Sequence, residues 1–451
     1  MPTELNGARD LLERTLSLAK NGGASAAECL WLSSCSRSFS VCDDELEKSR
    51  TSFSSTLGLR VLDRKGRQGV ACLTDLDENA SERLCDMAFL SARYAAVEDD
   101  VVFPEVQPQI SAEDLGVYDP QVPEWTPEDQ IALCMSMSRQ ARELDLRVKK
   151  VRTAALDTAW GESLMLNSNG VEIYRRSTAG GIGVALIAED GGASEIGGAG
   201  FDGRSRASLM STLPVKEAVE HTVRNLHGVP LRTGRYTLVL EPEVTASLLA
   251  AVSELFSAAN VCKGLSLLAG KMGQQVASES LTLVDDGRLH GGLGTSFCDS
   301  EAVSTRRTVV LERGKLSSWL CNLQYGRRLG LPSTGNGSRG PSSLPDVDVT
   351  NFFVKPGVRP WEEIVAMHDG CFCVTELMGL HTIDTVTGDF SLAARGLYYK
   401  DGNFSPVSSV TIAGTLGELL GKVTEVGSDL RFYDRFGGCT LVVDDIAVAG
   451  A

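Results

Sequence analysis

The sequence predicts an α+β protein with two domains, on three observations. The chain has 451 residues, about two to three times the length of a typical single domain, so each half can bury its own core. Helix-spaced apolar residues followed by a strand meander occur twice in the first half. The second half is rich in short strands and turns, in keeping with 46 glycines. We expect helix-plus-strand-meander layers in residues 1–230 and a mostly antiparallel, strongly curved sheet in residues 231–451.

The first half is expected to open with an amphipathic helix that ends near Asn21. A second helix is expected over residues 77–96, and an irregular, proline-containing connector over residues 98–125. Thr126 followed by Pro127 predicts the capped start of a helix that reaches Arg142. The strands predicted in this half are residues 28–34, 37–42, 51–62, 69–73, 148–157, 162–166, 171–177 and 182–188. A last helix is expected over residues 214–226.

The second half is expected to begin with a strand at residues 235–241 and a helix whose apolar stripe runs from Leu248 to Ala259. Two short helices are predicted at residues 360–367 and 415–423. The segments 285–287, 312–315 and 400–403 have the composition of tight hairpin turns.

Composition excludes several classes of protein. The net charge of −16 disfavours direct binding to nucleic acid, which requires clustered Lys and Arg. No run of about eighteen apolar residues could span a bilayer, and the N-terminal sequence has no secretory leader, so we expect a cytoplasmic protein. The twelve cysteines form no CxxC pair, so most are expected to be reduced and buried.

The densest group of chemically capable residues lies between Gly370 and Gly396. Cys371 and Cys373 would point both thiols to the same face of a strand, with His381 as the only nearby base. Packing is the simpler use of these thiols and of Cys439, and a cysteine enzyme is the lowest-ranked interpretation. Neither HExxH nor GxSxG nor a phosphate-binding loop occurs, and adjacent acids such as Asp285 and Asp286 fit turn or cap roles.

From residue 270 onward the chain resembles the TldD/TldE family, also called PmbA or modulator-of-gyrase proteins. The resemblance rests on collinear segments that cover nearly the whole second half, and it is vaguer in the first half, at residues 58–61, 67–69 and 167–170. These segments read GKMGQQVASESLTLVDDG (270–287), DSEAVSTRR (299–307), LERGKLSSWL (311–320), STGNGSRG (333–340), CVTELMGL (373–380), TGDFSLAARG (387–396) and TIAGTL (411–416). One departure is the sequence from Leu392 to Arg395, where smaller residues are expected.

TldD-type chains carry an HExxxH zinc motif on the helix before the GKMGQ-like segment. Here that helix contains Glu254 but no histidine. Because a hydrolytic zinc needs several protein ligands, the chain resembles the metal-free TldE type.

The resemblance implies a cytosolic zinc protease built as a heterodimer, with the zinc on a TldD-type subunit and no cofactor on this chain. Its substrates would be unfolded peptides, in peptide maturation and antitoxin degradation. The alternative is a stand-alone peptide-binding homodimer without protease activity. The peptide-cleft candidates, chosen on motif position, are Thr334, Asn336, Arg339, Glu376, Gly379 and Asp389. For each of them a turn or core hydrogen bond is an equally good interpretation.

Overall fold

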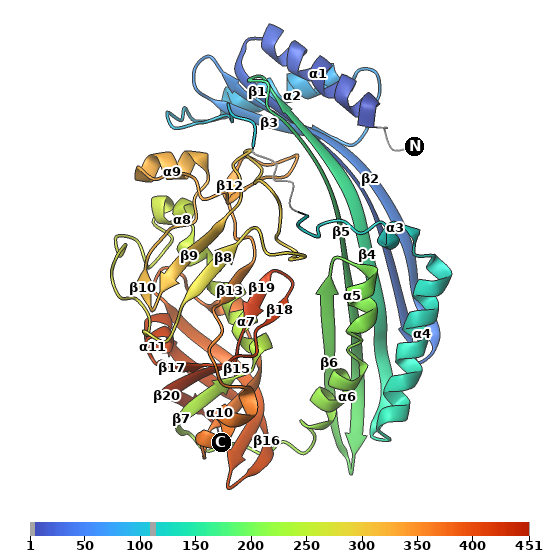
Figure 1. Cartoon of the computed structure of the whole chain (residues 1–451), viewed down its shortest axis with the longest axis vertical. Coiled ribbons are helices and arrows are strands. Elements are labelled where there is room, and N and C mark those ends of the chain that lie inside the picture. Colours follow the sequence, from blue (N-terminus) through green and yellow to red (C-terminus); the bar gives the residue numbers. More distant parts are fainter. Residues whose placement is uncertain (1–4, 109–113, 451) are drawn as a thin grey trace.

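The computed structural model describes residues 5–108 and 114–450, and it confirms the α+β class. The first half builds one long, strongly curled six-stranded antiparallel sheet, in the order β3-β2-β1-β4-β5-β6 (Figure 1). Its elements are α1 (Leu5–Asn21), β1 (Ala24–Cys42), β2 (Glu45–Asp63), β3 (Gln68–Leu73), α2 (Ala80–Tyr94), α3 (Gln121–Glu124), α4 (Pro127–Leu144), β4 (Val148–Asn167), β5 (Glu172–Asp190), β6 (Ala193–Gly203), α5 (Arg206–Ser211) and α6 (Val215–Val223).

Two helix-and-meander units make up this sheet, joined where β1 pairs with β4. Helices α1 and α2 pack on its upper part, around Trp31 and Leu59. Helices α4 and α6 pack on its lower part, around Phe39 and Leu156. As predicted, Thr126 caps α4 by accepting a hydrogen bond from the Asp129 amide (3.2 Å).

Three of the predicted strand breaks are wrong. Each of β1, β4 and β5 runs unbroken where two short strands were expected, and β6 was not expected at all. The serine- and glycine-rich middles of these strands have the composition of turns, but each is paired on both sides in the sheet. The connector over residues 98–125 is irregular apart from α3, and its residues 109–113 lie outside the described part.

The second half contains two further six-stranded sheets, in the orders β16-β15-β14-β7-β20-β17 and β10-β9-β8-β13-β19-β18. Pairing of β16 with β20 curls the first of these back on itself. The elements are β7 (Gly234–Leu240), α7 (Pro242–Val252), η1 (Ser253–Phe256), α8 (Ala258–Lys263), β8 (Leu283–Asp286), β9 (Arg307–Glu312), β10 (Lys315–Leu316), α9 (Leu323–Leu329), β11 (Gly337–Ser338), β12 (Asp346–Val347), β13 (Phe352–Val354), α10 (Trp361–Met367), β14 (Phe372–Met378), η2 (Leu380–Thr382), β15 (Asp389–Lys400), β16 (Asn403–Thr415), α11 (Leu416–Gly421), β17 (Val423–Val426), β18 (Arg431–Tyr433), β19 (Phe436–Gly438) and β20 (Leu441–Ala449).

Two of the predicted hairpin turns are confirmed, between β9 and β10 and between β15 and β16. The third is wrong, because β8 ends at Asp286 but its antiparallel partner β9 begins only at Arg307. The predicted helix from Leu248 to Ala259 is also interrupted, and it divides into α7, η1 and α8. Nine of the twelve cysteines are buried and all twelve are free thiols, as predicted.

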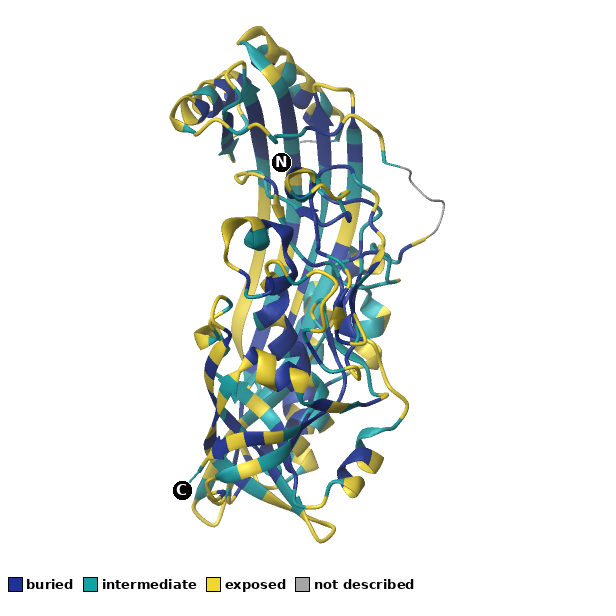
Figure 2. Ribbon diagram, turned by 90° about the vertical axis from the view of Figure 1, so that its left-hand side faces the viewer, coloured by how far each residue is buried: buried dark blue, intermediate teal, exposed yellow. Residues whose placement is uncertain are grey.

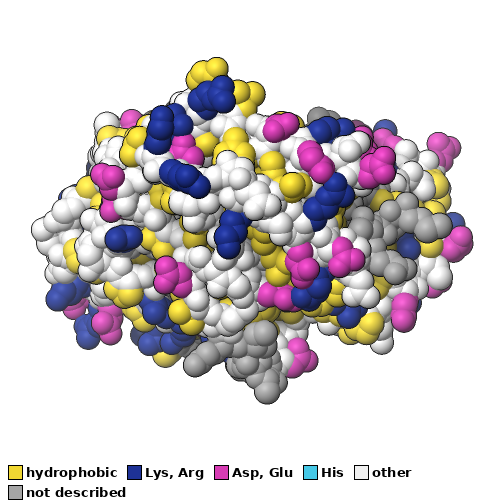
Figure 3. Space-filling model, turned by 90° about the horizontal axis from the view of Figure 1, so that it is seen from above, with side chains coloured by type: hydrophobic (Ala, Val, Ile, Leu, Met, Phe, Trp, Pro, Cys, Tyr) yellow, Lys and Arg dark blue, Asp and Glu magenta, His cyan; other side chains and the backbone are white. Residues whose placement is uncertain are grey.

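The second half packs against the concave face of the long sheet (Figure 1). Arg204 donates hydrogen bonds to the carbonyls of Gly292 (3.0 Å) and Leu293 (2.6 Å). A Cβ on Gly58 would lie 2.1 Å from the Pro341 carbonyl oxygen, so this contact requires glycine in β2. Seen from above, the described surface intersperses basic and acidic side chains (Figure 3), and Arg14 with Glu82 is one ion pair at this end.

The described helices include none that is both long and apolar enough to cross a membrane.

Candidate functional site

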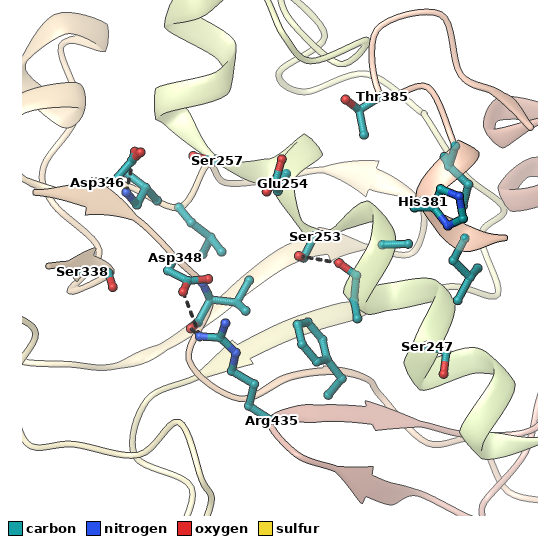
Figure 4. Close-up of a pocket in the computed structure, with 18 residues that line it drawn as sticks. Ser247, Ser253, Glu254, Ser257, Ser338, Asp346, Asp348, His381, Thr385 and Arg435 are labelled. Carbon is teal, nitrogen blue, oxygen red and sulfur yellow. Dashed lines mark hydrogen bonds and ion pairs between the residues drawn. The ribbon is translucent and has the colours of Figure 1, made fainter. Parts of the chain in front are cut away.

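A cavity of about 940 Å³ opens in the second half, where the helix predicted from Leu248 to Ala259 is interrupted. Its walls come from α7 and η1, from the β11–β12 hairpin, and from η2 (Figure 4). We call it the Glu254 pocket. The polar and charged residues that line it are Ser247, Ser253, Glu254, Ser257, Ser338, Asp346, Asp348, His381, Thr385 and Arg435.

Most polar groups of this pocket are held by near neighbours. Ser253 donates to the Ala250 carbonyl (3.0 Å), which turns its hydroxyl back onto α7 (Figure 4). Ser257 caps α8 by accepting a hydrogen bond from the Ala259 amide. Asp348 accepts from Arg435 at 2.9 Å. The exposed Glu254 accepts only a long contact from Asn260, at 3.5 Å, and is the least constrained acid of the wall.

The zinc that the TldD type would require does not fit these residues. If Glu254 is the glutamate of an HExxxH pattern, Ser253 and Ala258 stand at its two histidine positions. Neither can supply a ring nitrogen, and Ala258 is fully buried. His381 is the one histidine of the lining. Across residues 5–108 and 114–450, no group of three His, Cys, Asp or Glu is placed to hold a metal ion, whereas a catalytic zinc has three protein ligands.

None of the six predicted cleft residues lines the Glu254 pocket, although two support its wall. Thr334 and Asn336 are buried and hydrogen-bonded to each other at 2.7 Å. Asn336 also donates to the Asp348 carbonyl (2.9 Å) and to the buried Asp285 carboxylate (2.8 Å). These two residues therefore fix the backbone of the segment that carries Asp348 into the pocket.

Arg339 lies elsewhere, in the contact between the two halves. Its side chain is 1% exposed and forms an ion pair with Glu28 of β1, which is fully buried. Arg60 of β2 completes the group, with its guanidinium 4.0 Å from the Glu28 carboxylate and its Nε donating to Gln68 (2.9 Å). Burial lowers the pKa of Arg60.

The remaining three candidates lie along β14 and β15. Glu376 is half-exposed and forms a loose ion pair with Arg395 at 3.8 Å. Gly379 has a positive φ of 86° and turns the chain into η2, a conformation that favours glycine. Asp389 is exposed at the start of β15. The segment that follows Gly379 does reach the pocket, through Leu380, His381, Ile383 and Thr385.

Cys371 lies just before β14 and Cys373 lies in it, and their sulfur atoms are 3.8 Å apart on one side, as predicted. They are buried against Ile364 and Val365 of α10 and do not line the Glu254 pocket. Burial also raises the pKa of Cys439 to about 12. A buried, protonated thiol is a poor nucleophile.

The sequence interpretation missed Asp346, Asp348 and Arg435 as pocket residues. Asp346 and Asp348 are two positions apart, five residues after the end of the STGNGSRG motif, and this spacing is the one signal that could have indicated them. The sequence gives no comparable signal for Arg435, because its partner Asp348 lies 87 residues away.

A cluster of buried acids lies beneath the β11 segment. Asp299 accepts hydrogen bonds from three backbone amides, including that of Gly337 (2.8 Å), while Glu301 accepts one from the Leu323 amide (2.8 Å). Burial is the main cause that raises the pKa of Asp299 to about 6 and the pKa of Glu301 to about 8. The charge of Asp299 raises the pKa of Glu301 further.

These raised pKa values predict that Glu301 stabilises the fold at low pH and that this contribution is lost as the pH rises. The folded protein holds the proton more tightly than the unfolded chain between pH 4.5 and about 8, so the free energy of unfolding falls across that window. Glu301→Gln cannot ionise. The stability of this variant relative to the wild type should therefore be higher at pH 8.5 than at pH 5.5, by about 3 kcal/mol. Urea denaturation at both pH values measures this, and an equal difference at both would contradict it.

Comparison with known proteins places this geometry in one family. Three sequence models match the chain: PmbA/TldA metallopeptidase domain 1 at residues 27–92, the central domain at residues 120–226, and the C-terminal domain at residues 233–450. Metalloprotease PmbA of Escherichia coli O157:H7 is 26% identical over 454 residues, which cover 99% of this chain and 98% of that protein.

Solved structures show the same fold. TldE from Thermococcus kodakarensis has a TM-score of 0.88 at 22% identity, and the match covers 98% of this chain and 100% of that one. A proposed modulator of a DNA gyrase from Thermotoga maritima has a TM-score of 0.88 at 23% identity, over 98% and 100% of the two chains. On the match of all three domains, in order, the chain belongs to the PmbA/TldD family of metalloprotease-like proteins.

Proposed function

We propose that this chain is the non-catalytic, TldE-like subunit of a cytosolic zinc metalloprotease that acts on unfolded peptides. The catalytic zinc would be held by a TldD-type partner with an HExxxH helix. One observation carries the proposal: Ser253 and Ala258 occupy the histidine positions beside Glu254. The Glu254 pocket lies against this helix, and serine and alanine at these two positions would not bind a zinc ion there.

The Glu254 pocket supports a role in holding extended peptide. Its lining mixes hydroxyls and charged groups with apolar side chains such as Leu320, Val349 and Phe436. Asp346 and Val347 of β12 form part of the wall, and β12 pairs with β11 on one side. An extended peptide could add to such a short strand through backbone hydrogen bonds, which are largely independent of sequence. Selection of unfolded chains would then follow from access to the pocket.

The test is reconstitution with a TldD-type chain. We expect neither chain alone to cut an unstructured peptide at an appreciable rate. We expect the mixture to co-elute on size exclusion, to bind zinc and to cut the peptide. The matched control is a mixture in which the partner's HExxxH glutamate is replaced by glutamine, which should assemble and remain inactive.

Two results would overturn this assignment. Zinc-dependent cleavage by this chain alone would show that it is itself the catalyst. A mixture that fails to assemble, in which this chain still binds the peptide, would instead favour the stand-alone peptide-binding protein.

A further inference from the structure

A second cavity lies between the concave face of the long sheet and the second half of the chain. Its volume is about 590 Å³. The lower parts of β1, β4 and β5 form its floor, β2 forms its outer rim, and Leu293 and Asp434 reach it from the second half. The rim residues Lys48 and Arg50 are exposed, and Figure 2 shows the exposed colour running down this outermost strand. We call this cavity the sheet groove.

The floor of the sheet groove is made of small side chains. Ser36 of β1, Ala159 of β4 and Ala179 of β5 lie in one row across the sheet. Because side chains alternate along a strand, the larger residues of the same strands, such as Phe39 and Leu156, lie on the other face with α4. The depth of the groove is therefore left free of bulky side chains.

The lining of the groove is polar and carries charges of both signs. On the rim, Lys48 has no partner among the described residues, and Arg50 donates only to Ser52 (2.9 Å). On the floor, Asp157 also has no hydrogen bond or ion pair within the described part of the chain. Apart from Leu293, the described lining offers no large apolar side chain. Such a surface does not suit an acyl chain or an apolar helix, but it suits a polar, extended polypeptide.

The sheet groove and the Glu254 pocket meet at the turn between β18 and β19. Asp434 of this turn lines the groove, and the next residue, Arg435, lines the Glu254 pocket. A smaller cavity of about 160 Å³ joins them, because it shares Asp348 and Arg435 with the pocket. Its other wall includes Gly294, which follows Leu293 of the groove in the sequence.

The side chain of Arg435 is the part of this junction that can move. It donates to the Asp348 carboxylate (2.9 Å) and to the Val349 carbonyl (3.2 Å). Arg435 is 34% exposed and Asp348 is 43% exposed. An ion pair as exposed as this one contributes little stability, so a bound chain can displace it at small cost.

We propose that one unfolded polypeptide occupies the Glu254 pocket and the sheet groove together, and passes from one to the other beside the β18–β19 turn. The pocket holds one segment of the polypeptide, and the groove holds the segment beyond it. This inference rests on the proposed function for the class of ligand, and it adds the path of the bound chain. Because the two segments are linked, a polypeptide long enough to fill both cavities binds more tightly than one that fills the pocket alone.

Peptide length gives the first test. Fluorescence anisotropy is measured with two unstructured peptides of matched composition, of about six and about eighteen residues, which extend over roughly 20 and 60 Å. The protein is the reconstituted pair in which glutamine replaces the HExxxH glutamate of the partner, so that peptide is bound and not cut. The longer peptide is expected to bind at least about tenfold more tightly. If the pair does not assemble, the same measurements on this chain alone decide the inference.

Ser36→Trp tests whether the groove is responsible for the gain. Ser36 is exposed and lines the groove but not the Glu254 pocket, so tryptophan should obstruct the floor and leave binding of the short peptide unchanged. The affinity for the long peptide should fall to near that for the short one. In the active pair, the variant should raise KM for the long peptide without lowering kcat. The matched control is Ser49→Trp, since Ser49 is exposed on β2 but alternates with Lys48 and Arg50 and faces away from the groove.

Photochemical crosslinking locates the bound chain. With a photoreactive group at one end or the other of the long peptide, one of the two derivatives should link to β1 or β4 within the groove, in the wild type and in Ser49→Trp but not in Ser36→Trp. Equal affinity for both lengths, equal losses in the two tryptophan variants, crosslinks found only outside the groove, or no peptide binding at all would overturn the inference. Failure of the proposed function is a different result, namely a pair that does not assemble or that does not cut even the short peptide.

Discussion

Arg339→Met is expected to lower the free energy of unfolding by about 3–5 kcal/mol, because it leaves the carboxylate of Glu28 buried without its partner. Glu28 is fully buried and Arg339 is 1% exposed, so water cannot replace the lost contact. Arg60 lies 4.0 Å from Glu28 and donates its hydrogen bonds to Gln68 and the Val102 carbonyl, so it offers Glu28 a longer and weaker contact than Arg339 does. Urea or guanidinium denaturation of the purified chain measures the loss.

The double variant Glu28→Leu/Arg339→Met shows whether the loss of stability comes from the unpaired charge of Glu28 or from the lost packing of the Arg339 side chain. It should be more stable than Arg339→Met alone, since replacing both members of a buried pair by apolar residues is often neutral. Even in the wild type, Glu28 Oε2 and two nitrogens of Arg339 have no hydrogen-bond partner, so replacing both side chains removes buried polar atoms that are already unsatisfied. The surface control is Arg313→Met, because Arg313 is 75% exposed beside Glu279 and should change stability by less than about 0.5 kcal/mol. Equal losses for Arg339→Met and Arg313→Met would contradict this account.

Helices and tight turns could be predicted because their signals are local. The Thr126-Pro127 start of α4 and the Asp401-Gly402 turn between β15 and β16 depend on residues within a few positions of each other. The length of β1 could not be predicted in this way. Cys35 and Ser36 have the composition of a break, but they continue the strand because Phe53 and Ser52 of β2 pair with them on one side and β4 pairs on the other.

The roles of the candidate residues depend on partners that are remote in sequence. Asn336 contacts Asp285, 51 positions away, and Arg339 contacts Glu28, 311 positions away. Motif position placed these side chains in a cleft, whereas both are buried in the structure. The lack of a zinc motif could be read from the sequence, because the positions that would hold its histidines lie within a few residues of Glu254. Only the fold shows that Glu254 lies on a pocket wall.

Gly438→Ala is expected to destabilise the protein by about 3 kcal/mol and to disturb the Glu254 pocket. A Cβ at this buried position in β19 would lie 1.9 Å from the Pro242 carbonyl oxygen and 2.7 Å from the Ala246 amide nitrogen. Both atoms are backbone of α7, so no side chain can rotate away and the helix itself must move. Ser247 and Ala250 of the same helix line the pocket, so its wall would move with it.

Thermal unfolding and amide hydrogen exchange distinguish this effect from a general loss of stability. Gly438→Ala should lower the Tm. It should also speed amide hydrogen exchange in α7 more than in α4, which packs on the long sheet of the first half. The control is Gly417→Ala in α11, where an added Cβ meets nothing within 4 Å. There the substitution should be neutral or stabilising, because alanine restricts the unfolded chain and favours helix. If Gly438→Ala left exchange in α7 unchanged, the close packing of β19 on α7 would not be what fixes this wall of the pocket.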